Sequence, residues 1–305
     1  MSAVKNPSPI THHPLRIPYF PGCALKDQAR VFEESARAAM QALGYDLAEL
    51  PRWNCCGTVY SLASDDLIRH LGPVRNLIRV QELVEGRLVT LCAMCYNTLA
   101  RSSHFVQADP ERLQRINAFM DEEEDYRGGV EVLHLLQLLR DEVGFEEIEA
   151  KVARPLVGVR VAPYYGCMLL RPREVGIDNP DSPEVMEELF SSLGAEPVEF
   201  SQRAECCGAY QAVSRPEITR ARVEEIASAA RRAGAELIAT SCPLCQFNLG
   251  TRQGDALEWY PGARPLPVVY FTQLLALALG APEDKLGFEL LRLDPRPVLS
   301  KKELV

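Results

Sequence analysis

The sequence lacks the signatures of several common functions. Its 305 residues contain no Walker loop, no GxGxxG fingerprint and no serine–histidine–acid set, so a built-in nucleotide site or hydride donor is not expected. No basic block of five residues occurs, and the net charge of −9 disfavours nucleic acid and anionic membranes as partners. No apolar run reaches the roughly 18 residues of a membrane span. The sequence therefore predicts neither nucleic-acid binding nor membrane insertion.

A secretory signal is also missing. The chain begins with the polar, proline-bearing segment MSAVKNPSPITHHPL, so we expect a cytoplasmic location. In a reducing compartment, ten cysteines in a chain with 47% hydrophobic residues are not needed as structural disulfides. The cysteines therefore indicate metal or redox chemistry.

These ten cysteines form two sets of five with nearly the same spacing. The intervals between successive cysteines are 31, 0, 35 and 2 residues in the first set, and 38, 0, 34 and 2 in the second. The sequences that flank the cysteines also repeat, since IPYFPGC (17–23) corresponds to VAPYYGC (161–167). We infer an internal duplication with domains at 1–150 and 151–305. The first set is Cys23, Cys55, Cys56, Cys92 and Cys95, and the second is Cys167, Cys206, Cys207, Cys242 and Cys245.

Each half has the pattern of strands alternating with helices. Short apolar runs that predict strands lie at 15–20, 45–50 and 87–91, and again at 158–165, 196–200 and 236–241. Helices are predicted near 27–43, 64–86 (broken at Gly72-Pro73), 183–193 and 216–233. This alternation predicts an α/β fold of two pseudo-symmetric halves, each a parallel sheet covered by helices.

The cysteines follow the predicted strands. All five of a half are therefore expected at the carboxyl ends of parallel strands, the edge where open α/β sheets bind ligands. Each CxxC also opens a predicted helix, whose N-terminus favours thiolate over thiol. Gly57 and Gly208 follow the two vicinal cysteine pairs and would let the backbone approach a bound group closely.

Three kinds of site use cysteines in this way. Structural zinc takes four ligands, and five sulfurs exceed that number. A thioredoxin-like dithiol would use CAMC (92–95) or CPLC (242–245) and leave three cysteines of each half unexplained. An iron–sulfur cluster draws thiolates from separated segments, and a fifth sulfur finds a use if one thiolate bridges two irons or the cluster is not a simple cubane.

The pattern C-x31-CC-G-x34-C-x2-C, followed by C-x38-CC-G-x33-C-x2-C, resembles the twin cysteine-rich CCG domains in the B subunit of heterodisulfide reductase. The segments PYFPGC, CCG, YYGC and CPLCQFNL stand where that family has them, and the resemblance extends over roughly 17–280. The module is also similar to CCG domains in subunits of anaerobic glycerol-3-phosphate dehydrogenase, lactate-utilisation proteins and thiol-linked fumarate reductases.

The resemblance implies two non-cubane 4Fe–4S clusters, one held by each set of five cysteines. It further implies that a small disulfide is reduced between them in single-electron steps. Electrons would come from a ferredoxin-like iron–sulfur subunit, which is fed by a flavin subunit. Two other hypotheses stay open: a non-catalytic electron relay that uses the same clusters, and a zinc-bearing scaffold.

A few further residues have two interpretations each. Arg171 and Arg173 follow Cys167 and are candidates for binding an anionic substrate group, although solvent-facing side chains are the simpler interpretation. Trp53 lies two residues before Cys55, where it would shield a cluster or only pack. His134 aligns with Tyr270 of the other half, which favours packing over ligation. Sheet-core positions are predicted for Tyr19, Phe20, Tyr164 and Tyr165.

Overall fold

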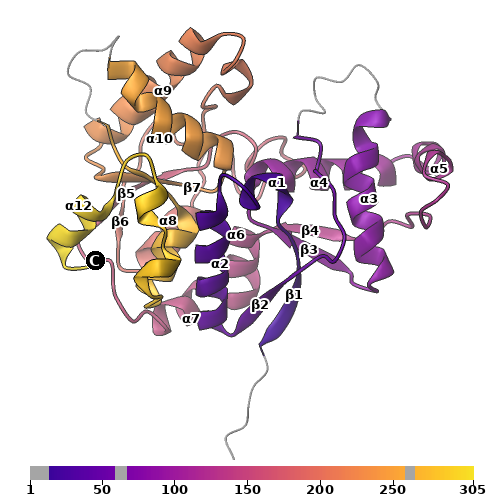
Figure 1. Ribbon diagram of the computed structural model, residues 1–305, viewed down its shortest axis with the longest axis horizontal. Helices are drawn as coiled ribbons and strands as arrows, with labels where there is room; N and C mark the ends of the chain where they lie inside the picture. Colours follow the sequence, from indigo (N-terminus) through magenta and orange to yellow (C-terminus); the bar gives the residue numbers. More distant parts are fainter. Residues whose placement is uncertain (1–13, 59–66, 258–264) are drawn as a thin grey trace, which may run out of the picture.

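The structure is a computed structural model, which describes residues 14–58, 67–257 and 265–305. It contains two four-stranded parallel sheets, each with its own helices (Figure 1). The first sheet has the order β2-β1-β3-β4 and consists of β1 (Leu15–Phe20), β2 (Tyr45–Glu49), β3 (Arg87–Thr90) and β4 (Glu131–His134). The second has the equivalent order β6-β5-β7-β8 and consists of β5 (Arg160–Tyr164), β6 (Glu196–Pro197), β7 (Leu237–Thr240) and β8 (Val268–Tyr270). The predicted α/β fold of two similar halves is confirmed.

The pairing register repeats between the sheets. Thr90 pairs with His134 in the first sheet, and Thr240 pairs with Tyr270 in the second. The inner strands are buried beyond their first residues, including residues 17–20 and 237–240, so both faces of each sheet are covered.

The helices of the first half are α1 (Gly22–Leu25), α2 (Arg30–Leu43), α3 (Ile68–Glu82), α4 (Ala93–Gln107), α5 (Pro110–Phe119), α6 (Leu135–Leu138) and α7 (Phe145–Ala150), with the π-helical turn η2 (Leu139–Val143). The predicted break at Gly72-Pro73 is wrong, because α3 continues through Pro73. Proline disfavours the helical conformation of the preceding residue partly through that residue's Cβ, and Gly72 has none.

The helices of the second half are α8 (Val185–Ser192), α9 (Pro216–Arg232), α10 (Pro243–Leu257), α11 (Phe271–Ala278) and α12 (Arg296–Leu299). Short 3-10 turns are η3 (Ala209–Gln211), η4 (Glu283–Lys285), η5 (Phe288–Leu290) and η6 (Ser300–Lys302). The strand expected at 196–200 is only two residues long. Pro197 fits this edge strand, because its neighbours Glu196 and Val198 donate the N–H groups that bond to β5 and to the residue before it.

The two halves share a buried contact between α2 and α11. The Phe32 ring stacks on Tyr270 with 4.2 Å between centroids. The buried hydroxyls of Ser35 and Thr272 lie 2.7 Å apart. We propose that the domains meet at 150/151, where α7 ends, with α2 and α11 holding them together.

Among the described residues, none of the helices combines the length and the apolar character that crossing a bilayer requires. The N-terminal segment from which a cytoplasmic location was predicted lies largely outside the described residues, which begin at 14.

Candidate metal centre

The cysteines lie after the carboxyl ends of the strands. In the first half Cys23 follows β1, the pair Cys55 and Cys56 follows β2, and the CxxC of Cys92 and Cys95 follows β3. The second half repeats this placement after β5, β6 and β7. Because β1 lies between β2 and β3, and β5 between β6 and β7, each set gathers at the point where the strand order reverses. All ten cysteines are free of disulfides.

Within each set the sulfurs contact one another in pairs. The Sγ atoms of Cys56 and Cys95 are 3.4 Å apart, and those of Cys23 and Cys55 are 3.9 Å apart. In the second set the corresponding thiols are also neighbours, because Cys206 raises the pKa of Cys167 and Cys245 acts on the pKa of Cys207. The two halves therefore assemble their sulfurs in the same way.

The two sets also touch each other. The thiols of Cys92 and Cys242, each the first cysteine of its CxxC, are neighbours across the boundary between the halves, close enough that each shifts the pKa of the other. Beside them, the backbone N–H of Ala93 donates to the carbonyl of Ser241 at 3.1 Å. The ten thiols thus form one continuous group.

Exposure differs within and between the sets. The inner sulfurs belong to six buried residues, which are Cys56, Cys92, Cys95, Cys207, Cys242 and Cys245. Cys23 and Cys55 are exposed, whereas their counterparts Cys167 and Cys206 are half-buried. The second set lines a small, mostly apolar cavity together with Tyr165, Tyr210 and Leu244. The first set is therefore the more open to solvent.

Crowding of the thiols separates their pKa values. Hydrogen bonds from Cys55 and Cys95 lower the pKa of Cys56 to about 3, and those from Cys167 and Cys207 lower the pKa of Cys206 to about 2. A thiol that donates such a hydrogen bond holds its proton more tightly. The pKa of the donor Cys55 is therefore raised, first by its bond to Cys56 and then by burial. Adjacent thiolates repel one another, so ionising all five requires added positive charge, which metal ions supply.

Two glycines leave room for the inner sulfurs, and sequence analysis missed them. A Cβ on Gly22 would lie 2.8 Å from Cys95 Sγ, and one on Gly166 would lie 3.3 Å from Cys245 Sγ. Both glycines have a positive φ, +72° and +66°. Their sequence signal is the glycine directly before the first cysteine of each half.

The glycines that follow the vicinal pairs contact the sulfur of the first cysteine of each pair. The N–H of Gly57 donates to Cys55 Sγ at 3.5 Å, and that of Gly208 donates to Cys206 Sγ at 3.3 Å. Both have a positive φ, +76° and +81°. Such amide donors stabilise thiolate charge.

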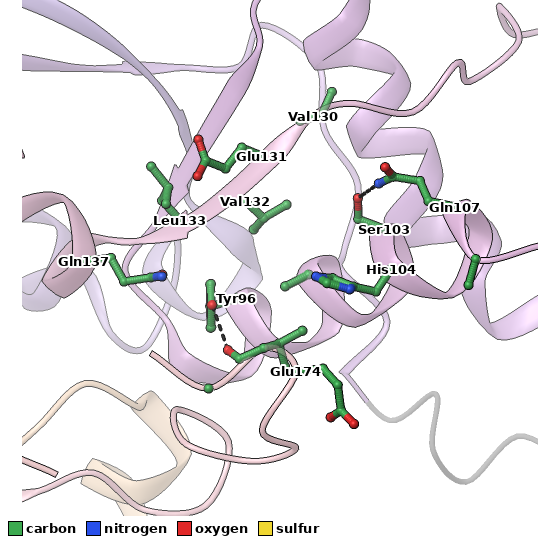
Figure 2. A pocket seen from close by; sticks show the side chains of 14 residues that line it. Tyr96, Ser103, His104, Gln107, Val130, Glu131, Val132, Leu133, Gln137 and Glu174 are labelled. Atoms are coloured by element: carbon green, nitrogen blue, oxygen red, sulfur yellow. Dashed lines mark hydrogen bonds between the residues drawn. The ribbon is translucent and has the colours of Figure 1, made fainter. Parts of the chain in front are cut away.

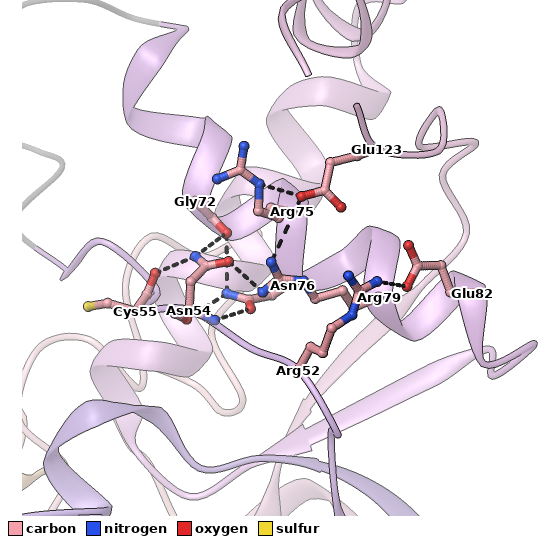
Figure 3. Close-up of polar contacts among 9 residues, drawn as sticks. All are labelled: Arg52, Asn54, Cys55, Gly72, Arg75, Asn76, Arg79, Glu82 and Glu123. Atoms are coloured by element: carbon pink, nitrogen blue, oxygen red, sulfur yellow. Dashed lines mark hydrogen bonds and ion pairs between the residues drawn. The ribbon is translucent and has the colours of Figure 1, made fainter. Parts of the chain in front are cut away.

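Figure 3 shows what holds the first vicinal pair in place. The buried Asn76 of α3 accepts from the N–H of Asn54 at 3.0 Å and donates to the carbonyl of Asn54 at 3.0 Å. The Asn54 side chain in turn donates to the carbonyls of Cys55 and Gly72. Arg79 donates to Asn54 Oδ1 at 2.8 Å. Cys55 is thus tied to α3 through its neighbour.

The second vicinal pair is held by different residues. Thr219 Oγ1 donates to the carbonyl of Gly208 at 3.0 Å, and Arg222 Nε donates to that of Cys206 at 3.3 Å. Because the supporting residues differ between the halves, no repeated motif identified them in the sequence.

Buried hydroxyls near the CxxC motifs lack protein partners. Within the described parts of the chain, the side-chain oxygens of Thr90, Thr240 and Ser241 are buried without a hydrogen-bond partner. They precede Cys92 and Cys242 by one or two residues. Together with the thiol sets and the glycine contacts, these spare donors fit a sulfur-rich metal cofactor.

The arrangement does not match a single ion. In the segments that the structure describes, no group of three or more His, Cys, Asp or Glu side chains is placed to hold one metal ion. Zinc held by four converging ligands is therefore not preformed there.

A larger cavity of about 520 Å³ lies elsewhere, between α4 and the edge strand β4 (Figure 2). It is lined by polar side chains such as His104, Gln107 and Glu131, and no cysteine lines it. Two of its lining residues are bonded to each other, since Tyr96 O–H donates to the carbonyl of Val175 at 2.8 Å. This cavity is separate from the sulfur group.

The two candidate arginines have local partners, and the four candidate aromatic residues are buried. Arg171 donates to the carbonyl of Ala204 at 2.8 Å, and Arg173 pairs with Asp181 at 2.9 Å, both at exposed positions. The four aromatic residues predicted for the sheet core are buried, namely Tyr19, Phe20, Tyr164 and Tyr165. Neither arginine reaches the sulfurs through a contact of its own, and Tyr165 alone of the four lines the sulfur cavity.

Trp53 and His134 both pack. The Trp53 ring meets Phe20 edge-on at 5.7 Å. His134 accepts from Leu136 N–H through Nδ1 and donates to the carbonyl of Leu91 through Nε2, so it caps α6 as a neutral ring. The packing interpretation of His134 is therefore correct.

Comparison with known proteins agrees with this geometry. The CCG cysteine-rich domain matches residues 17–100 and 161–250, which are the two halves of the sulfur group. The chain belongs to the CCG cysteine-rich domain family. The resemblance to the B subunit of heterodisulfide reductase is confirmed, with two CCG copies in one chain.

Relatives of this CCG chain have been named in bacteria and archaea. The 8-methylmenaquinol:fumarate reductase membrane anchor subunit of Wolinella succinogenes is 32% identical, over 88% of this chain and 94% of its own. The B subunit of the ferredoxin/F420H2-dependent CoB-CoM heterodisulfide reductase of Methanosarcina acetivorans is 29% identical, over 90% and 92%. A hypothetical protein from Helicobacter pylori shares the fold with a TM-score of 0.72 at 13% identity, covering 92% of this chain and 52% of that one.

Proposed function

We propose that this CCG chain is the iron–sulfur catalytic subunit of a heterodisulfide reductase-like complex, an oxidoreductase that cleaves a small disulfide. The observation that carries the proposal is the joining of two five-thiol sets into one group through Cys92 and Cys242. A disulfide that entered this junction, which is closed in the structure, would lie within reach of both sets. Relatives named as B subunits of heterodisulfide reductases support the assignment.

The ten cysteines would hold two 4Fe–4S clusters of non-cubane type, one per half. When bound, these clusters would supply the two electrons that break an S–S bond, and with two protons the products are two thiols. The residues around the cysteines would hold the sulfur ligands in position. Gly57 and Gly208 donate amide N–H groups to outer sulfurs, while Gly22 and Gly166 leave space for inner ones.

Electrons must come from outside, because the sequence has no nucleotide fingerprint of its own. We propose that the partners are a flavin protein and a ferredoxin-like iron–sulfur subunit, in a cytoplasmic multisubunit complex. A complex is supported by relatives that are named as subunits, including one named for a membrane anchor role.

A non-catalytic electron relay is the second candidate function. It is favoured by the closed contact between Cys92 and Cys242, which are both buried and leave no exposed sulfur at the boundary between them. A relay would pass electrons between partner subunits without cleaving a disulfide.

The deciding experiment is anaerobic purification followed by measurement of iron, zinc and acid-labile sulfide per chain. Two four-iron clusters give about eight irons and eight sulfides. EPR spectra are then recorded after addition of small disulfides to the oxidised and reduced protein. A new paramagnetic signal on addition of a disulfide supports catalysis at this chain.

Full iron without a response to any disulfide would favour the relay. About four irons would mean that only one set is loaded. Zinc in place of iron would end both redox proposals and leave the scaffold.

A further inference from the structure

The two halves differ in the segment that follows the first cysteine of each set. The interval from that cysteine to the vicinal pair is 38 residues long in the second half and 31 in the first. In the first half this interval soon enters α2, whereas in the second half residues 168–177 form turns and the next helix is α8. Because turns leave backbone carbonyls without the partners that a helix or sheet supplies, the 168–177 segment needs donors from elsewhere.

Asn97 on α4 holds the start of the 168–177 segment. Its Nδ2 donates to the carbonyls of Met168 and Arg171, at 2.8 and 2.7 Å, so both hydrogens of the amide are used. Asn97 is 1% exposed, which shields these bonds from water. The bonds cross from the first half of the chain, which contains α4, to the second.

Two further side chains of the first half hold the rest of the segment. Tyr96 O–H donates to the carbonyl of Val175 (Figure 2), and Arg140 Nη1 donates to that of Ile177 at 2.8 Å. Together with the two bonds from Asn97, these contacts tie the 168–177 segment to the first half along its length.

The residues that follow the second CxxC make different contacts. Gln246 and Phe247 hold the positions equivalent to Tyr96 and Asn97. Gln246 Nε2 donates to the carbonyl of Val268 in its own half at 3.3 Å, and Phe247, whose side chain has no donor, is 50% exposed. The two CxxC motifs are therefore alike, but the residues directly after them are not.

The segment that Asn97 holds begins at a cysteine of the second set. Met168, whose carbonyl accepts one of the bonds, directly follows Cys167. On the other side of Cys167, the N–H of Gly166 donates to the carbonyl of Arg203 at 3.2 Å. Cys167 thus lies between an anchor in its own half and an anchor in the other half.

The first half also supplies part of the wall around the second set. Ala93 and Met94 of α4 line the small cavity that contains Cys167 and Cys245. Asn97 follows Met94 on the next turn of the same helix. One helix of the first half therefore both closes this cavity and holds the segment after Cys167.

We propose that the second metal site is a composite of both halves, in which Asn97 is the positioning residue for Cys167. The inference rests on the proposed function, because it concerns the cluster that the second set would hold. Without the two donors of Asn97, the 168–177 segment would leave the first half and carry Cys167 away from Cys206. Loss of Asn97 would then remove metal from the half to which Asn97 does not belong, while Cys23, which lies in α1, would keep its place.

The test uses the full-length, anaerobically purified protein. Asn97→Leu removes both donors at similar side-chain volume, and Tyr96→Phe removes the single donor to Val175. Asn117→Leu is the matched control, because Asn117 bonds to the Tyr126 backbone instead. Iron per chain and the EPR spectrum are measured. The rate at which iodoacetamide alkylates Cys167 is measured by mass spectrometry on the folded, metal-free chain.

Asn97→Leu is expected to keep about half of the wild-type iron and to give the EPR spectrum of Cys207→Ala, in which the first set remains. In its metal-free form, Cys167 should be alkylated at least about fivefold faster than in wild type. That factor is what one typical hydrogen bond contributes to a local opening equilibrium. Cys23, the equivalent cysteine of the first set, should react within about twofold of its wild-type rate.

The other two variants grade the effect. Tyr96→Phe should raise the alkylation rate of Cys167 by less than Asn97→Leu does, because one donor is lost instead of two. Asn117→Leu should match wild type in iron, EPR spectrum and alkylation rate.

A Cys167 alkylation rate in Asn97→Leu equal to that of wild type would overturn the inference, whatever the iron content. Loss of the first set's EPR signal in place of the second's would also overturn it, because Asn97 would then act on its own half. If circular dichroism shows that Asn97→Leu does not fold, Tyr96→Phe decides, and an unchanged Cys167 rate there would overturn the inference. An iron-free wild-type protein instead defeats the proposed function, and the rate on the metal-free chain still decides the role of Asn97.

Discussion

The thiol of Cys92 is the neighbour of the thiol of Cys242, so the first cysteines of the two CxxC motifs meet where the halves join. Both residues are buried, and the backbone bond from Ala93 to Ser241 fixes the helix starts beside them. The two sets are therefore neighbours at one contact and separate elsewhere. This geometry distinguishes the cysteines whose loss would affect one set from those whose loss would affect both.

Replacement of a cysteine that does not lie at the contact between the two sets should affect one set only. We expect Cys55→Ala to lose the first set's iron and Cys207→Ala the second's, each leaving about half of the wild-type iron. The remaining EPR signal should differ between the two variants, because a different set survives. Iron analysis and EPR spectroscopy check this, and undiminished iron in both variants would show that these sulfurs are not ligands.

Replacement of Cys92 should change both sets, the first in its iron content and the second in its EPR signal. We expect Cys92→Ala to remove the first set's iron and also to shift the EPR signal of the second, because Cys242 loses its neighbour. Cys23→Ala, at the exposed end of the first set, is the matched control and should leave the second signal unchanged. Identical spectra for the two variants would mean that the contact has no influence.

The space beside the inner sulfurs depends on Gly22. We expect Gly22→Ala to strip the first set, because its Cβ would lie 2.8 Å from Cys95 Sγ. Gly44→Ala is the matched control, since Gly44 also has a positive φ, +94°, but has nothing within 4 Å of its Cβ. Both variants should lose about 1 kcal/mol of stability from backbone strain, and only Gly22→Ala should lose iron. Equal iron in the two would refute the steric role.

Asn76 holds the segment before Cys55 by two-way hydrogen bonds to the Asn54 backbone. We expect Asn76→Leu to lower the free energy of unfolding by about 1–3 kcal/mol and to reduce the first set's iron. Asn117→Leu is matched, because Asn117 makes the same two-way bonds to the Tyr126 backbone, on a surface helix away from the cysteines. Iron retained in Asn76→Leu at a stability equal to that of Asn117→Leu would contradict a positioning role.

His134 should make the protein less stable in acid. Burial lowers its pKa to about 3, and the bond to Leu91 offsets this only in part. An unfolded histidine has a pKa near 6.5, so between these values the unfolded chain binds a proton that the native chain does not. The free energy of unfolding should therefore fall with decreasing pH, by up to about 1.4 kcal/mol per pH unit below 6.5.

The measurement is urea unfolding at pH 7 and pH 5. His134→Tyr, which introduces the residue found at the equivalent position of the second half, should lose less stability than wild type between the two pH values. His104→Tyr, on the exposed side of α4, is the control substitution. A pH difference as large in His134→Tyr as in wild type would assign the acid sensitivity to other groups.

The repeated features of this protein were predictable from sequence. Two equal cysteine sets required two similar halves, and strands that end just before cysteines predicted that each set would gather at a sheet edge. The equivalence of His134 and Tyr270 also followed from alignment of the halves, and both residues precede a short helix in the structure.

The features that differ between the halves were not predictable in this way. Asn76 and Arg222 support the two vicinal pairs through unrelated contacts, so no repeat pointed to them. The continuity of α3 through Pro73 depends on the glycine before it, a local effect that helix-breaking rules alone miss. The exposure of Phe247, at 50% where its counterpart Asn97 is buried, is a tertiary property that the repeat does not reveal.

The contact between α2 and α11 limits how this duplicated chain can be divided. Phe32 and Ser35 of the first half are buried against Tyr270 and Thr272 of the second, so a fragment that ends at residue 150 would expose an apolar helix face to water. Separate fragments are expected to need each other in order to fold. A gene split at the junction would then encode two obligate partners, and neither copy of the duplication could be lost without the other.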